Sequence, residues 1–252
     1  MEVSGNFCVE LKKSVRNHAL LPDNLRMLIC GPSASGKTVL LFNLLLQESW
    51  LDYTHLFIVS HSLFQKEYKL LRECLEMGLS KAEIRACFKE NRVIFEGKKD
   101  PSINFTFYSD EKELPPPTEL PIGPKYLIVF DDLILSKHNI VKQYFTQGRH
   151  SGADIIFLAQ SYFFLDRQIV RSNSNFLICF KQPYKSLPHL FADFCSDLAY
   201  EEFRSLCNNI WKGDHNFLSI DVNAKLLDGH FRKNLDSFYI PRQFVCDENG
   251  LE

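Results

Sequence analysis

The stretch Gly31-Pro32-Ser33-Ala34-Ser35-Gly36-Lys37-Thr38 has the pattern G-x-x-x-x-G-K-T, and it decides the fold class of this chain. Its glycines let successive backbone N–H groups turn inward around phosphates, and the helix that follows adds positive potential at its N-terminus. The stretch follows the apolar run Met27 to Cys30 and opens a second one, Val39 to Leu46. A phosphate-binding loop requires this order of strand, loop and helix. We therefore expect these eight residues to bind ATP.

Two side chains of this loop and two later carboxylates are expected to bind Mg²⁺-ATP. Lys37 would bridge the outer phosphates, and the Thr38 hydroxyl would ligate Mg²⁺. Asp131 and Asp132 directly follow the apolar run Tyr126 to Phe130, as a second metal-binding motif would. We expect Asp131 to hold Mg²⁺ through its water shell and Asp132 to activate the attacking water. Many motor ATPases have a glutamate at the second position, and an aspartate is one methylene shorter.

Short apolar runs rich in β-branched and aromatic residues alternate with helical apolar spacing along the chain. This alternation predicts an α/β fold around a mostly parallel sheet. The expected strands are Met27–Cys30, Leu56–Val59, Tyr126–Phe130, Ile155–Ala159 and Phe176–Phe180, with further candidates at Arg92–Glu96, Phe105–Tyr108 and His215–Val222, the last closing the sheet. The expected helices span 37–48, 65–77, 80–88, 138–147, 165–171, 186–197 and 199–211.

The distance between the two motifs separates the branches of P-loop proteins. One strong and two weaker strand candidates lie between Lys37 and Asp131, so the strand before Asp131 is not the next one after the loop. This favours the motor-type P-loop NTPase fold, a three-layer sandwich with an additional strand, over small kinases. In that fold Asp154 to Ala159 would lie between the two motif strands. Its end would bring Gln160 to the γ-phosphate, where an amide can bond both phosphate oxygen and water.

Composition limits the surroundings in which the chain works. The net charge of -2 excludes a uniformly basic surface, so any contact with nucleic acid must come from a local patch or from several subunits. The eight cysteines form no C-x-x-C pair, which indicates a reducing compartment. We see no secretion signal and no uncharged stretch of 18 residues, so neither secretion nor a membrane span is expected. The expected parts are an N-terminal arm over 1–24, a P-loop ATPase core over 25–182, and helices with a closing strand over 183–252, packed on the core.

Several segments resemble the FtsK/HerA superfamily, and within it the genome-packaging ATPases of large DNA viruses, virophages and Polinton-type elements. The resemblance covers about residues 24–182. It rests on Leu127–Leu133 (LIVFDDL), Gln147–Gly152 (QGRHSG), Ile155–Phe163 (IIFLAQSYF) and Arg171–Asn175 (RSNSN), with His61–Tyr68 (HSLFQKEY) after the second strand. The superfamily shares an Arg-x-x-Gly joint before an apolar strand that ends in Gln, and this chain has both parts.

The resemblance implies an ATP-driven double-stranded DNA translocase that packages a viral or mobile-element genome into a capsid. Its copies would form a homo-pentamer or homo-hexamer that threads DNA and hydrolyses ATP at subunit interfaces. The implied partner is a capsid vertex protein. The implied location is the site of virion assembly in the host cytoplasm or nucleus, or the virion itself. An interface site needs an arginine from the neighbouring subunit. Arg149 matches the superfamily's arginine and is our first choice, with Arg171 second.

Contacts with DNA are less visible in the sequence. The segment from residue 137 to 185 contains seven Lys and Arg residues and only two acidic residues. These basic residues could line a channel or form a solvated face. A translocase grips the phosphate backbone without reading bases, so Lys137, His138 and Lys142 are the residues to test. Two other functions stay open at this point. One is a small-molecule or nucleoside kinase, and the other is a protein in which ATP only switches an assembly surface.

Overall fold

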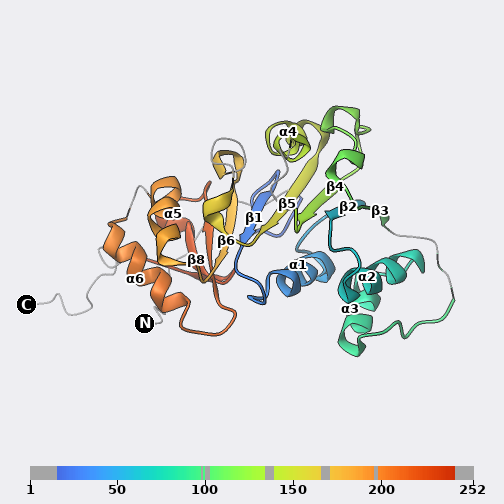
Figure 1. Cartoon of the computed structure of the whole chain (residues 1–252), viewed down its shortest axis with the longest axis horizontal. Helices are drawn as coiled ribbons and strands as arrows, with labels where there is room; N and C mark the ends of the chain where they lie inside the picture. Colours follow the sequence, from blue (N-terminus) through green and yellow to red (C-terminus); the bar gives the residue numbers. More distant parts are fainter. Residues whose placement is uncertain are drawn as a thin grey trace, which may run out of the picture.

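Residues 16–97, 99, 103–133, 139–165, 171–195 and 198–241 are described by a computed structural model. Among them runs one nine-stranded sheet in the order β3-β2-β4-β5-β1-β6-β7-β8-β9 (Figure 1). The strands are β1 (Arg26–Cys30), β2 (His55–Ser60), β3 (Asn104–Tyr108), β4 (Tyr126–Asp131), β5 (Ala153–Ala159), β6 (Phe176–Phe180), β7 (Phe217–Asp221), β8 (Phe231–Lys233) and β9 (Ser237–Phe238). The first six pair in parallel, and β7, β8 and β9 join antiparallel.

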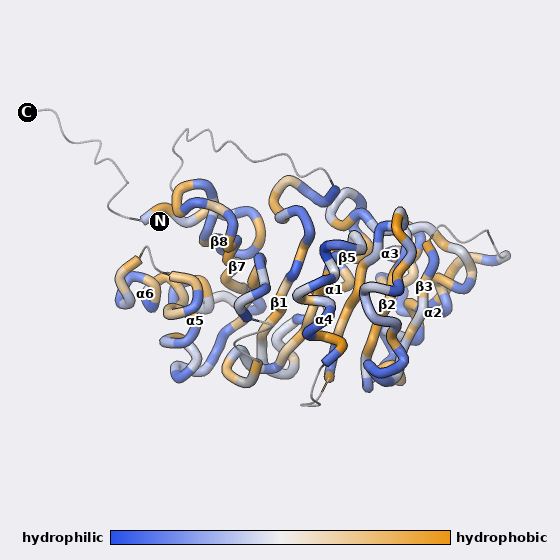
Figure 2. The backbone as a smooth tube through the Cα atoms, turned by 90° about the horizontal axis from the view of Figure 1, so that it is seen from above, coloured by the Kyte–Doolittle hydropathy of each residue, from blue (hydrophilic) through white to orange (hydrophobic). Residues whose placement is uncertain are grey.

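Helices cover both faces of this sheet. They are α1 (Lys37–Leu46), α2 (Lys66–Glu76), α3 (Lys81–Glu90), α4 (Asn139–Gln147), α5 (Leu187–Phe194) and α6 (Tyr200–Ile210). In β1, Met27 and Ile29 pack with α1, α2 and α3, whereas Leu28 and Cys30 pack with α4, α5 and α6. Figure 1 shows α1 to α3 on the opposite side of the sheet from α4, and Figure 2 shows the hydrophobic residues along β1 and β5. The parallel strands are therefore buried on both faces, as continuous apolar runs require.

The position of β5 confirms the motor-type, three-layer fold predicted from the sequence. β5 lies between β4 and β1, with Ile155 opposite both Arg26 and Ile128 in the register. The strand before Asp131 is thus separated from the P-loop strand by one inserted strand. This order brings the carboxyl ends of β1, β4 and β5 to the same edge of the sheet, here called the carboxyl edge.

Three predicted elements differ from the structure. The segment Arg92–Glu96 is wrong as a strand, because α3 ends at Asn91 in a left-handed conformation and the next residues run half-exposed without joining the sheet. Most of the predicted helix 165–171 lies outside the described residues, and Leu165 itself is not helical. The predicted strand 215–222 exists as β7 but does not close the sheet, because β8 and β9 continue it. Among the described residues, no helix is long and apolar enough to cross a membrane.

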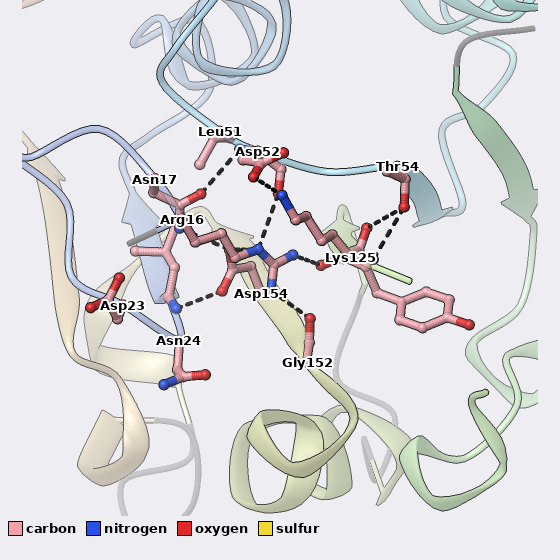
Figure 3. Close-up of polar contacts among 12 residues, drawn as sticks. Arg16, Asn17, Asp23, Asn24, Leu51, Asp52, Thr54, Lys125, Gly152 and Asp154 are labelled. Carbon is pink, nitrogen blue, oxygen red and sulfur yellow. Dashed lines mark hydrogen bonds and ion pairs between the residues drawn. The ribbon is translucent and has the colours of Figure 1, made fainter. Parts of the chain in front are cut away.

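The opposite edge of the sheet, here called the amino edge, is held by Arg16 (Figure 3). Its guanidinium donates hydrogen bonds to three backbone carbonyls, those of Asp52 (3.0 Å), Tyr126 (2.7 Å) and Gly152 (2.5 Å). It also lies 3.4 Å from the carboxylate of Asp154, at the start of β5. One arginine thus ties the segment before β1 to the segment before β2, to the first residue of β4 and to the turn before β5.

Asp154 is the acceptor at the centre of the same cluster and is only 1% exposed. It accepts from the Asn17 amide and from the backbone N–H of Leu25, each at 2.8 Å. Burial raises the pKa of Asp154, and the Arg16 charge and these two donors oppose that rise. Four groups from three segments therefore satisfy one another within a buried site, which is the condition for burying a charge.

Candidate nucleotide-binding site

The phosphate-binding loop lies between β1 and α1 at the carboxyl edge, and its backbone requires glycine. Gly36 has φ 104° and Ala34 has φ 59°, both in the left-handed region. A Cβ on Gly31 would lie 2.5 Å from Ser35 Oγ and 2.8 Å from Phe180 Cβ, so no larger residue fits there. These two constraints bend the chain into the concave shape in which successive N–H groups can face a phosphate.

Lys37 and Ser35 place polar groups inside this concavity. Lys37 Nζ donates to the carbonyls of Gly31 (2.6 Å) and Pro32 (2.8 Å), so the ammonium lies across the loop. Burial lowers the pKa of Lys37, and the carboxylates of Asp131 and Asp132 counteract that shift. Ser35 Oγ is buried and makes no hydrogen bond within the described part of the chain. A polar atom left this way fits a site built to accept a phosphate group.

Asp131 ends β4 beside the loop and is only 9% exposed. The Tyr68 hydroxyl donates to its carboxylate at 2.5 Å. Burial raises the pKa of Asp131, the Tyr68 hydrogen bond lowers it, and the neighbouring Asp132 raises it. The Ser62 hydroxyl donates to the carboxylate of Asp132, and the backbone of Asp132 has φ 52°. The first aspartate is therefore buried and oriented, and the second is held by a left-handed backbone and a hydroxyl.

Tyr68 and Ser62 received no role from the sequence, although both lie in the segment His61–Tyr68 that carries part of the family resemblance. Their partners are aspartates 63 and 70 residues later in the chain. The sequence feature that could have revealed them is the motif His61–Tyr68 itself, which supplies two hydroxyl donors after β2. Because β2 and β4 are neighbours in the sheet, with Ser60 opposite Asp131, these donors reach the two aspartates.

Gln160 follows β5 directly and is exposed at the carboxyl edge. The residue before it, Ala159, is opposite Cys30 in the register and accepts a hydrogen bond at 3.0 Å from the N–H of Gly31. The amide side chain therefore starts next to the first residue of the phosphate-binding loop. The structure thus brings together the loop, Asp131, Asp132 and Gln160 at one edge.

The two candidate arginines occupy different surroundings. Arg149 is exposed in a 3-10 turn, Gly148–Ser151, at the amino edge. Burial lowers the pKa of Arg26 at the start of β1, and the nearby Arg149 charge lowers it further. Arg149 is thus at the opposite edge from the loop of its own chain.

Arg171 is buried at 7% exposure and forms an ion pair of 3.1 Å with Asp193. Its guanidinium lies 4.9 Å from the ring centre of Tyr162, whose hydroxyl donates to the same Asp193 at 2.8 Å. A residue that reaches a neighbouring subunit has to be exposed, and Arg171 is not. The internal ion pair therefore argues against Arg171 as the arginine that acts in a neighbouring subunit.

The candidate DNA-contacting residues are only partly within the described structure. Lys137 and His138 lie outside the described residues. Lys142 is half-buried on α4, the helix that leads to Arg149. Of these three candidates, the structure therefore describes Lys142 alone.

The donor set also fits Mg²⁺ bound together with a nucleotide. Mg²⁺ usually takes one or two protein ligands, with phosphate oxygens and water completing its shell. Thr38, at the start of α1, and the buried Asp131, at the end of β4, supply one hydroxyl and one carboxylate at the carboxyl edge. Among the described residues no group of three or more His, Cys, Asp or Glu side chains could hold a metal.

No family model and no curated protein matches this chain. Among solved structures it is similar to the genome-packaging NTPase B204 of Sulfolobus turreted icosahedral virus 2 in complex with sulfate. That match has 15% identity and a TM-score of 0.49, and covers 84% of this chain and 96% of B204. It is also similar to the cytoplasmic domain of the type VII secretion ATPase EccC of Thermomonospora curvata. There the identity is 12%, the TM-score 0.43, and the cover 87% of this chain and 27% of EccC.

Proposed function

We propose that this chain is an ATPase that uses hydrolysis to move double-stranded DNA, and that it packages a viral or mobile-element genome. The observation that carries the proposal is the insertion of β5 between the P-loop strand and the strand of Asp131. Through it Gln160 lies beside the loop, where a residue that senses the γ-phosphate has to be. The sequence resemblance to FtsK/HerA packaging ATPases supplies the DNA part of the proposal.

Each side chain of the site has one task in this mechanism. Loop N–H groups and Lys37 bind the phosphates and stabilise the charge that grows on them. Asp132, fixed by Ser62, accepts the proton of the attacking water, and Gln160 orients that water or the γ-phosphate. Thr38 and Asp131 would hold a bound Mg²⁺, which would supply positive charge to the phosphate oxygens. Tyr68 keeps the Asp131 carboxylate turned toward the loop.

The proposed assembly is a homo-pentamer or homo-hexamer in which Arg149 serves a neighbouring subunit. An arginine that clamps the transferring phosphoryl group in trans must be exposed and away from its own loop, and Arg149 meets both conditions. The proposed partners are duplex DNA, with Lys137, His138 and Lys142 as candidate contacts, and a capsid vertex protein. The proposed location is the site of virion assembly in the host cytoplasm or nucleus.

The first test measures ATP hydrolysis with and without duplex DNA, together with particle mass in the presence of nucleotide. We expect DNA to stimulate hydrolysis in particles of five or six copies. Lys37→Ala should abolish hydrolysis. A monomer that binds ATP and hydrolyses none with DNA would instead support the ATP-switched assembly protein.

The second test asks whether Arg149 acts in trans. Arg149→Ala should bind ATP normally and lose hydrolysis by about 10³-fold or more, the range for an arginine of this kind. Mixing it with Lys37→Ala should restore part of the activity, because an intact loop then meets an intact arginine at some interfaces. Arg85→Ala, which removes an exposed arginine on α3, is the matched control and should behave as wild type. A mixture as inactive as its components would exclude action in trans.

A further inference from the structure

The turn between α6 and β7 reaches the phosphate-binding loop from the far end of the chain. His215 Nδ1 lies 3.1 Å from the carbonyl oxygen of Ser35, 180 residues earlier in the sequence. A Cβ on Gly36 would lie 3.4 Å from the same nitrogen. Because a carbonyl oxygen can only accept, Nδ1 carries the hydrogen and donates it. The C-terminal part of the chain, to which the sequence assigned no role, thus bonds directly to the loop.

This hydrogen bond controls the direction of a loop N–H. The Ser35 carbonyl and the Gly36 N–H belong to one trans peptide unit, in which the two groups point in opposite directions. Holding the carbonyl toward His215 therefore turns the Gly36 N–H away from His215. Gly36, at φ 104°, has no Cβ that resists rotation of this peptide, so another contact has to fix it.

The turn that carries His215 is itself firmly placed. Trp211 Nε1 donates to the carbonyl of Cys179 at 3.0 Å. The backbone N–H of Asn216 donates to the carbonyl of Gly213 at 3.3 Å. Phe217, the first residue of β7, packs on Phe180 with ring centres 5.2 Å apart.

Phe180 in turn lies against the loop, because a Cβ on Gly31 would come within 2.8 Å of its Cβ. The loop is thus supported by Phe180 from β6 and tethered by His215 from the turn. His215 has φ 59°, a left-handed conformation that is unfavourable for a histidine and has to be maintained by its surroundings. Both contacts come from the part of the sheet beyond β1.

We infer that His215 is a positioning residue of the nucleotide site, which orients the Ser35–Gly36 peptide so that the Gly36 N–H is available to a bound phosphate. The inference rests on the nucleotide-binding part of the proposed function and not on DNA translocation. It assigns the α6–β7 turn to the same site as the loop, although that turn carries no phosphate-binding motif.

The test compares three variants by titration of a fluorescent ADP in the presence of Mg²⁺. His215→Ala should weaken binding by about 3- to 10-fold, the effect of one hydrogen bond. His215→Gly and His215→Asn both tolerate a left-handed backbone, but only asparagine can donate to the Ser35 carbonyl. Asparagine should therefore bind ADP within about 2-fold of wild type, whereas glycine should resemble alanine. In hydrolysis the KM for ATP should rise by the same factor with kcat little changed.

Thermal unfolding without nucleotide separates this role from general damage, because a positioning role predicts similar melting temperatures for the asparagine and glycine variants. Equal ADP affinity in these two variants would overturn the inference, as would wild-type affinity in the alanine variant. A wild-type protein that binds ADP but hydrolyses no ATP would sink the ATPase proposal and leave this comparison valid. A wild-type protein that binds no ADP would overturn both.

Discussion

The two edges of the sheet use polar residues in opposite ways. At the amino edge, Asp154 is buried and Arg16 is half-buried, and their hydrogen-bonding groups meet carbonyls, an amide and a backbone N–H. At the carboxyl edge, Ser35 Oγ is buried without a hydrogen bond, and burial raises the pKa of Asp131. Ala34, Gly36 and Asp132 also have positive φ there. At the amino edge the polar groups hydrogen-bond one another, whereas the carboxyl edge has polar groups and left-handed backbone that fit the binding of a ligand.

This difference separates stability from function along the same strands. Buried groups that satisfy each other stabilise the fold, whereas groups arranged for a ligand lower its stability. Substitutions at the amino edge should therefore change the free energy of unfolding and leave nucleotide binding intact. Substitutions at the carboxyl edge should do the reverse.

The largest effect is expected for Asp154→Ala. It removes the shared acceptor of the buried Asn17 amide, the buried Leu25 N–H and the half-buried Arg16. Unfolding should therefore become easier by about 3–5 kcal/mol, as for other broken buried ion pairs. Urea unfolding measures this change. Asp154→Asn keeps an oxygen for one donor and is the matched control, with a smaller expected loss. Where the variant still folds, its affinity for ADP should stay within about 2-fold of wild type. A loss below about 1 kcal/mol would show that the cluster does not hold this edge.

A change of opposite sign is expected for Asp131→Asn. Hydrolysis should fall by about 100-fold or more, the size of effect for a lost electrostatic group at a reacting centre. The folded protein should gain about 1 kcal/mol, because the amide removes a buried charge and still accepts from Tyr68. Thermal unfolding and an ATPase assay on the same preparation measure both changes. A less stable variant would contradict the view that this edge gives up stability for function.

The same variant predicts a pH dependence. Since the pKa of Asp131 is raised by folding, the folded chain binds this proton more tightly than the unfolded chain does. Ionisation therefore costs folding free energy, and the cost develops as pH rises from the unfolded to the folded pKa. The stability advantage of Asp131→Asn should be largest at neutral pH and shrink toward acid pH. Melting temperatures of both proteins across that range test the sign.

The smallest effect is expected for Lys125→Ala at the rim of the amino edge. Lys125 forms an ion pair with Asp52, and their side chains are 49% and 41% exposed. An exposed pair of this kind contributes little, so unfolding should change by less than about 0.5 kcal/mol. Urea unfolding of Lys125→Ala and Asp154→Ala under the same conditions shows whether burial determines how much free energy of unfolding is lost. A loss as large as that of Asp154→Ala would contradict this.

The sequence predicted the loop, five core strands and the insertion of β5, because long apolar runs and the spacing of two motifs carry that information. It could not predict β8 and β9, which have three and two residues and are too short for periodicity to register. The segment Arg92–Glu96 has strand-like residues but pairs with none of the described strands. Local propensity alone does not supply a partner.

The contacts that hold the two edges of the sheet could not be predicted for a different reason. Arg16 and His215 both donate to backbone carbonyls, and a carbonyl is present at every position whatever the side chain. No residue pattern therefore marks the acceptor. Tyr68 and Ser62 were visible as part of a motif, but their roles depended on β2 and β4 being neighbours, which residue types do not encode.

The place of β1 in the sheet determines when the chain can first bind a nucleotide. β1 is synthesised before both of its neighbours in the sheet, β5 and β6, which come more than 120 residues later. Such distant pairings form slowly, and an unpaired apolar strand is prone to aggregation meanwhile. A nascent chain that ends before residue 150 has the whole phosphate-binding motif and neither strand to hold it. The loop therefore acquires its shape only after β5 and β6, the strands that support it, have been synthesised.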